Sequence, residues 1–254
     1  MKVVVCVKTS AGAAISPTEA FQRGGRVGVN VLAPFDAHAV EEALRIVEKD
    51  GNGEVVIVSV APAETLGAVR EALALGAHRG VMLSDPALAS SDVLAMSRAL
   101  AALLARERSD IYLTCSWSGD IDGTILWVAA AERMMLPVLT QARSLNIADE
   151  EAITVRQSEA GDVTMAAALP CMVEVTETIN NPRYPTIKGK LAAKSKPITM
   201  LRLADLGLPV TAAASGSNLV KLSQVPQRRR PIVIDNQDRA PQQIVEFLEA
   251  RNLI

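Results

Sequence analysis

The chain has 254 residues, of which 49% are apolar and 21% charged, a globular composition that permits one large domain with extensions or two lobes. Its formal net charge of -2 and its 3% aromatic residues argue against a nucleic-acid or anionic-membrane partner. The longest apolar run, residues 165–173, is too short to cross a bilayer, and Lys8 interrupts the apolar start before signal-peptide length. We therefore expect a cytoplasmic protein.

The first half of the chain alternates short apolar runs with amphipathic stretches. The runs predict buried strands at residues 2–7, 54–60, 80–83 and 111–115. The amphipathic stretches predict helices that begin at Asp36 as N-cap, at residue 63, at Ser91 or Asp92, and at about Thr124. Buried strands that alternate with helices form parallel sheets with both faces covered. The fold class is therefore α/β, with a doubly wound, mainly parallel sheet and helices on both faces.

The pattern changes after Pro137. Residues 144–158 alternate loosely, and residues 162–168 and 172–175 look like strands, which predicts a β-rich insertion. Beyond Asp205 the chain is polar and rich in Pro, Gln and Arg, and a helical pattern returns only at residues 241–253. We predict a domain over residues 1–208 and a C-terminal arm over 209–254 with a terminal helix.

The sequence carries no common enzyme signature. It has no GxSxG, HExxH or GxxxxGK[ST] motif, and the glycines at 51 and 53 belong to a turn. His38 and His78 are expected to be packing or surface residues, and the three cysteines are too far apart for a zinc or disulfide framework. We predict buried, inert thiols, no catalytic residue and no metal site.

Residues 116–124 join a predicted strand to a predicted helix. Small residues and the free N–H groups of a helix's first turn would seat a phosphate at the carboxyl edge of a parallel sheet. A plain turn capped by Asp122 or Thr124 explains the same residues equally well. The loops at residues 6–8, 33–36 and 60–62 would meet at that edge.

Residues 177–197 form a second candidate site. Two prolines bracket Tyr184, Ile187 lies nearby, and no acidic residue occurs between Thr178 and Ala204, whereas several lysines do. Apolar anchors among basic side chains suit docking on an acidic partner. A solvated basic loop and a nucleic-acid contact are the alternatives.

These residues together resemble the β subunit of electron transfer flavoprotein over about residues 1–208. The matching stretches are MKVVVCVK at 1–8, PFD at 34–36, VEEALR at 40–45, VSVAP at 58–62, REALALGA at 70–77, GDIDGT at 119–124 and NPRYPTIK at 181–188. The last is the most specific of these matches.

The resemblance implies an adenine-nucleotide α-hydrolase-like fold and an electron carrier subunit, not a stand-alone enzyme. An α subunit would carry the redox FAD, acyl-CoA-type dehydrogenases would donate electrons, and a quinone reductase or another acceptor would receive them. The β subunit would bind AMP, or a second FAD in electron-bifurcating members. The residues implied at this nucleotide are Cys6, Ala33, Pro34, Phe35, Asp36, Val60, Asp120, Asp122, Gly123, Thr124, Ile125 and Leu126. Those implied at the dehydrogenase are Arg183, Tyr184, Ile187, Lys188, Lys190, Lys194 and Lys196.

The chain departs from the family pattern in several places. Ala33 stands where Asn is usual, and Gly123-Thr124-Ile125-Leu126 replaces a Thr-Gly-Gln helix start, so side-chain hydrogen bonds to ribose or phosphate are lost. Backbone N–H groups would have to hold the phosphate. The segment from Thr9 to Val29 is also shorter than in the family. Two rivals stay open: a nucleotide-binding sensor module without electron transfer, and an enzyme that adenylates carboxylates.

Overall fold

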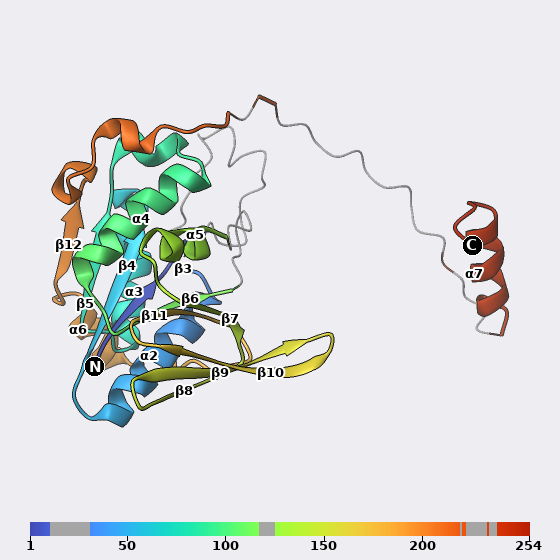
Figure 1. Cartoon of the computed structure of the whole chain (residues 1–254), viewed down its shortest axis with the longest axis horizontal. Helices are drawn as coiled ribbons and strands as arrows, with labels where there is room; N and C mark the ends of the chain where they lie inside the picture. Colours follow the sequence, from blue (N-terminus) through green and yellow to red (C-terminus); the bar gives the residue numbers. More distant parts are fainter. Residues whose placement is uncertain (11–30, 117–124, 219, 222–232, 234–237) are drawn as a thin grey trace. The chain divides into compact units, whose positions relative to one another are not determined.

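The computed structural model describes residues 1–10, 31–116, 125–218, 220–221, 233 and 238–254 (Figure 1). The chain divides into two units, Met1–Val220 and Lys221–Ile254, which are described separately.

A seven-stranded sheet forms the centre of the first unit, and all its strand pairs are parallel. In spatial order the strands are β12 (Ile198–Leu201), β5 (Arg79–Leu83), β4 (Glu54–Val60), β1 (Lys2–Cys6), β6 (Ile111–Cys115), β11 (Cys171–Val175) and β7 (Val138–Ala142). The strands that follow β1 extend the sheet first on one side, through β4 and β5, and then on the other, beginning with β6. The topological switch point therefore lies between β1 and β6.

Helices cover both faces of this sheet, which confirms the doubly wound α/β prediction. Helices α2 (Asp36–Asp50) and α3 (Leu66–Leu75) pack against one face, where Val3 and Val5 of β1 point. Helices α4 (Val93–Glu107) and α5 (Ile125–Arg133) pack against the other face, with Val4 and Cys6. Successive residues of a strand point to opposite faces, so a strand buried on both sides is apolar throughout.

A three-stranded antiparallel sheet follows β7, as the predicted β-rich insertion requires. It consists of β8 (Ser144–Ala148), β9 (Glu151–Ser158) and β10 (Gly161–Ala168). The assignment of residues 172–175 to this insertion is wrong, because β11 is buried along its whole length between β6 and β7 of the main sheet. Two short strands, β2 (Thr9–Ser10) and β3 (Val31–Leu32), pair antiparallel.

One predicted helix cap is wrong and another is confirmed. Phe35, not Asp36, is the N-cap of α2, and the buried Asp36 carboxylate instead accepts a 2.6 Å hydrogen bond from the Lys8 backbone N–H. Asp92 caps α4 by accepting from the Ala95 backbone N–H at 2.8 Å. The long-range hydrogen bond from Lys8 therefore replaces the capping role that was predicted for the Asp36 carboxylate.

The chain after β12 continues across α4 inside the first unit. Two short 3₁₀ helices, Leu203–Leu206 and Val210–Ala213, bury Leu203 and Ala213 in the core on the α4 side. The Gly216 backbone N–H donates to Asp92 at 2.7 Å. The second unit contains α7 (Ala240–Glu249), close to the predicted terminal helix. Among the described residues, no helix combines the length and apolar character needed to span a membrane.

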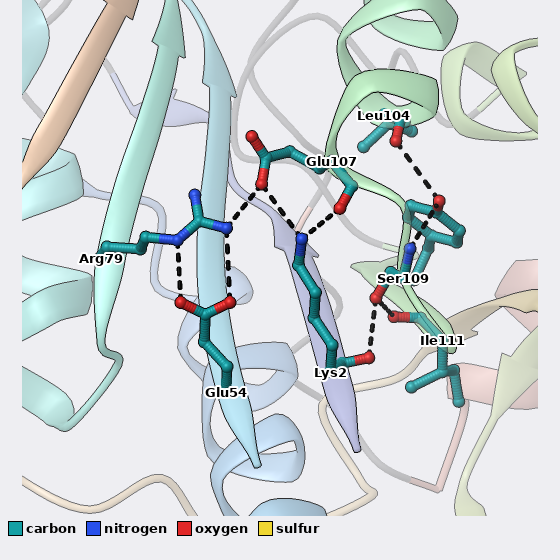
Figure 2. Close-up of polar contacts among 8 residues, drawn as sticks. Lys2, Glu54, Arg79, Leu104, Glu107, Ser109 and Ile111 are labelled. Atoms are coloured by element: carbon teal, nitrogen blue, oxygen red, sulfur yellow. Dashed lines mark hydrogen bonds and ion pairs between the residues drawn. The ribbon is translucent and has the colours of Figure 1, made fainter.

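Four charged side chains form a network at the amino edge of the sheet (Figure 2). Arg79 donates to Glu54 Oε1 at 2.8 Å and to Glu107 Oε2 at 2.7 Å, while Lys2 Nζ lies 3.3 Å from the same Glu107 oxygen. Burial alone would raise the pKa of Glu107, but Arg79 and Lys2 more than offset this effect and lower it. Glu107 therefore joins α4 to β1 and β5.

We predict that Glu107→Gln lowers the free energy of unfolding by about 1–3 kcal/mol at pH 7, because it weakens the bonds of two partly buried cations. The folded-state pKa is below the unfolded one, so this contribution is complete above the unfolded pKa of about 4.3 and is lost as pH falls through the folded pKa. Urea denaturation at pH 7 and in acid measures both effects. The control is Glu54→Gln, because Glu54 is more exposed and pairs with Arg79 alone; it should lower the free energy of unfolding by under about 1 kcal/mol. An equal loss in both variants would contradict the prediction.

Candidate functional site

The carboxyl edge of the sheet gathers the ends of β1, β4 and β6. The Val7 N–H donates to the Val58 carbonyl and the Ser116 N–H to the Val175 carbonyl, both at 2.9 Å, so the strand ends stay in register beyond the last assigned residues. The Ala33 N–H donates to the Lys8 carbonyl at 3.4 Å. Together with the Asp36 bond to Lys8, this contact fixes residues 33–36 beside the end of β1.

The described part of the predicted nucleotide set lies at or near this edge. Cys6, Ala33 and Asp36 are buried, Phe35, Val60 and Leu126 are half-buried, and Pro34 and Ile125 are exposed. Asp120, Asp122, Gly123 and Thr124 lie outside the described residues. The structure therefore places the loop at 33–36 beside the end of β1, next to the switch point between β1 and β6.

The side chains of this set offer little to a nucleotide. Among the described members, only Asp36 carries a charged side chain, and its carboxylate already binds the Lys8 backbone. Burial, and then the Asp36 charge, raise the pKa of the Cys6 thiol, which stays protonated. Ala, Pro, Phe, Val, Ile and Leu side chains have no hydrogen-bonding group for ribose or phosphate. Any hydrogen bonds from these described residues to a nucleotide would therefore come from backbone groups.

The docking segment, residues 177–197, exposes three large apolar side chains. Tyr184 is 93% exposed, Ile187 81% and Leu191 60%. Ile187 and Leu191 are four residues apart in the short helix α6 (Ile187–Ala193), so they share one face. Thr186 caps this helix by accepting from the Gly189 N–H at 3.0 Å. Leu191 was not in the predicted docking set, although its spacing from Ile187 could have signalled it.

Arg183 fastens the start of this segment to α2. Its guanidinium donates to Glu41 at 2.7 and 3.0 Å and to Glu48 at 2.6 and 3.0 Å, and its backbone N–H also donates to Glu41. The hydrogen bond from Arg183 lowers the pKa of Glu48 and keeps it charged. Next to it, Asn180 Nδ2 donates to Glu42 at 2.9 Å and to the His38 carbonyl at 3.0 Å.

The other end of the segment is fastened to α3. Arg70 Nη1 donates to the carbonyls of Ala193 and Lys196 at 2.6 and 2.5 Å. Lys196 Nζ donates to the Leu73, Gly76 and Ala77 carbonyls at the end of α3, at 2.6–3.3 Å. Arg183 and Lys196 therefore form hydrogen bonds within the protein. Lys188, Lys190 and Lys194 are instead neighbours in sequence of the exposed Ile187 and Leu191.

The remaining candidates have internal partners. His78 Nδ1 accepts from the Val55 N–H at 3.0 Å, and His38 Nδ1 lies 3.1 Å from the Asn180 carbonyl. Cys6, Cys115 and Cys171 are buried and form no disulfide bond, and burial raises the pKa of Cys171 to about 11. No group of three metal-binding side chains occurs within the described ranges. A cavity of about 380 Å³ opens beside β9, lined by Arg143, Ser144, Val155, Gln157 and Thr178, none of them a predicted site residue.

Gly189 sets how closely α6 approaches α3. A Cβ atom there would lie 2.5 Å from the Ala74 carbonyl oxygen, a backbone atom that cannot rotate away. We predict that Gly189→Ala costs about 1–3 kcal/mol of stability, in spite of the better helix propensity of Ala, and makes the docking segment more sensitive to proteolysis. The matched control is Gly216→Ala, whose Cβ would meet Asp92 at an ordinary 3.5 Å. Equal stability of the two variants would contradict the close packing.

Comparison with known proteins places this arrangement in a family. The electron transfer flavoprotein domain matches residues 26–206. An electron transfer flavoprotein subunit beta from Mycobacterium leprae is 34% identical over 88% of this chain and 87% of its own length. The protein of the same name from Megasphaera elsdenii is 29% identical over the full length of both chains. The caffeyl-CoA reductase-Etf complex subunit CarD of Acetobacterium woodii is 34% identical over 72% of this chain and 71% of its own. This chain belongs to the electron transfer flavoprotein family, in which its relatives are β subunits.

Proposed function

We propose that this chain pairs with a flavin-bearing α subunit and that the heterodimer carries electrons from an acyl-CoA-type dehydrogenase to a quinone reductase or another acceptor. The observation that carries the proposal is the docking segment: exposed apolar side chains on a backbone fastened to two helices. Within the electron transfer flavoprotein family, such a surface fits contact with an electron donor.

The chemistry of the segment suits a transient protein partner. Tyr184, Ile187 and Leu191 supply apolar contact area, and Lys188, Lys190 and Lys194 supply positive charge without a nearby acidic residue in sequence. Apolar anchors give affinity, while surrounding charges increase the rate of encounter with an acidic surface. Because Arg183 and Lys196 hold both ends, little ordering entropy is lost on binding. These two residues act as positioning residues in this proposal.

An electron-bifurcating role is the alternative within the same family. Similarity to a subunit of a caffeyl-CoA reductase-Etf complex favours it. That role needs a second FAD in this subunit, and the simple carrier role allows AMP there. The described side chains do not distinguish between these two nucleotides. A sensor module from outside electron transfer would not need the docking segment.

We predict that Ile187→Ala in the αβ complex raises the KM of the donor dehydrogenase for this carrier about tenfold, since loss of an interface anchor costs over about 1 kcal/mol. Rising ionic strength should slow electron transfer by screening the lysines. Steady-state reduction of the complex by an acyl-CoA dehydrogenase from the same genome measures both effects. The control Val210→Ala truncates another exposed apolar side chain, on a different element. An unchanged KM for Ile187→Ala would show that Ile187 is not an anchor for the donor, and a complex that the dehydrogenase does not reduce at all would favour the sensor.

We also propose that the arm binds the α subunit. In α7, Ile244, Val245 and Phe247 remain exposed, although Gln and Glu residues occupy other positions of this helix. Arg251 lies over the Phe247 ring, 3.8 Å from its centroid. An amphipathic helix after a polar stretch can lay its apolar face in a groove of a partner.

Deletion of residues 221–254 should weaken α-subunit binding by at least tenfold, because the whole apolar face of α7 is lost. The cut falls at the end of the first unit, so residues 209–218 and their packing on α4 are kept. Phe247→Ala should reproduce part of the loss, whereas Gln243→Ala should not. Titration of the α subunit with each purified variant measures the dissociation constant. An unchanged dissociation constant after the deletion would exclude this role of the arm.

A further inference from the structure

Residues 203–217, which we call the strap, lead from β12 to the last residues of the first unit, and α7 follows in the second unit. Leu203, at the start of the strap, is buried in the core on the α4 side. Beyond Leu208, Ala213 is the one buried side chain among the described strap residues. A single methyl group buries little apolar surface, so packing alone holds the end of the strap weakly.

Asp92 joins the N-terminus of α4 to the strap by two hydrogen bonds. Its Oδ1 accepts from the Ala95 backbone N–H at 2.8 Å and caps the helix, while its Oδ2 accepts from the Gly216 backbone N–H at 2.7 Å. These bonds, the one from Ala95 most, lower the pKa of Asp92, so the carboxylate is charged at neutral pH. Next to it, Ser91 Oγ donates to the Ala213 carbonyl at 2.7 Å. Two adjacent side chains therefore hold two backbone groups near the end of the strap.

Asp85 repeats this arrangement at the start of the strap. Its Oδ1 accepts from the Ala87 N–H at 3.0 Å and caps the 3₁₀ helix Pro86–Ser90, while its Oδ2 accepts from the Leu203 N–H at 3.2 Å. Among the described residues of the first unit, none after Gly216 forms a hydrogen bond with another element. Gly216 is therefore the last residue that such a bond fixes before the chain continues to α7.

We propose that Asp92 is a positioning residue for binding of the α subunit, because its bond to Gly216 fixes the point from which the chain leaves for α7. This inference rests on the proposed role of the arm and deepens it. A helix on a short tether from a fixed point has a higher effective concentration at its groove than the same helix on a longer tether, and this concentration falls roughly as the −3/2 power of tether length. Release of Ala213 and Gly216 would lengthen the tether back toward Leu208.

The first test uses the double variant Ser91→Ala/Asp92→Asn. Asn caps helices about as well as Asp, but its one carbonyl oxygen cannot replace both carboxylate oxygens, and Ser91→Ala removes the neighbouring bond. Amide hydrogen exchange of the purified full chain should become faster in peptides that cover residues 209–217, while exchange in the main sheet stays unchanged. Unchanged exchange in these peptides would overturn the inference.

The second test measures the dissociation constant of the α subunit for the same double variant. In the full chain it should rise about twofold to threefold, because the tether is longer. In a chain that ends at residue 220, the same substitutions should leave the dissociation constant unchanged, because no arm remains to be positioned. The control Glu132→Gln removes one negative charge from an exposed position of α5 and should change neither value.

Two results of this second test would overturn the inference alone. One is an unchanged dissociation constant of the double variant in the full chain, although deletion of residues 221–254 weakens binding. The other is an equal loss in the full and shortened chains, which would show a merely structural role for Asp92. If the deletion itself leaves the dissociation constant unchanged, the proposed role of the arm fails, and the inference fails with it.

Discussion

Three buried carboxylates on α2 determine how the functional parts of this protein are held. Asp36 binds the Lys8 backbone at the end of β1, Glu42 binds Asn180, and Glu41 binds Arg183. A buried carboxylate destabilises the fold unless it is paired and hydrogen-bonded, so each of these three carboxylates requires its partner at this position. Since all three carboxylates belong to one helix, the carboxyl edge of the sheet and the docking segment share a single rigid support.

This support holds an exposed segment that has little secondary structure of its own. Residues 177–197 contain only the short helix α6, yet Arg183 fastens their start to α2 and Arg70 and Lys196 fasten their end to α3. Gly189 lets α6 lie directly against the Ala74 carbonyl. The partner would therefore meet a surface that is already ordered. In electron transfer such order matters because the protein's contribution is to position cofactors held by the partners.

The carboxyl edge has the topology of a nucleotide site but different side chains. The switch point between β1 and β6 and the helix after β6 are present, as in other doubly wound folds. The described residues that meet there are mostly apolar, and Trp127 with Lys8 links β1 to α5. Function follows from the residues at the site rather than from the fold.

The sequence by itself determined the alternation of strands and helices up to residue 115, since apolar runs such as 54–60 and 111–115 between amphipathic stretches are typical of strands buried on both faces. It also singled out residues 177–197, in which Tyr184 and Ile187 are exposed. It did not predict β7, α6 or β12. It could not assign β11 to the main sheet, because a five-residue apolar run fits either sheet. Nor could it show that Asp36 binds β1 rather than capping α2, or that Arg183 pairs with Glu41, which lies far away in the sequence. Only the tertiary structure decided these points, because long-range pairing of buried charges overrides the local preference of each residue.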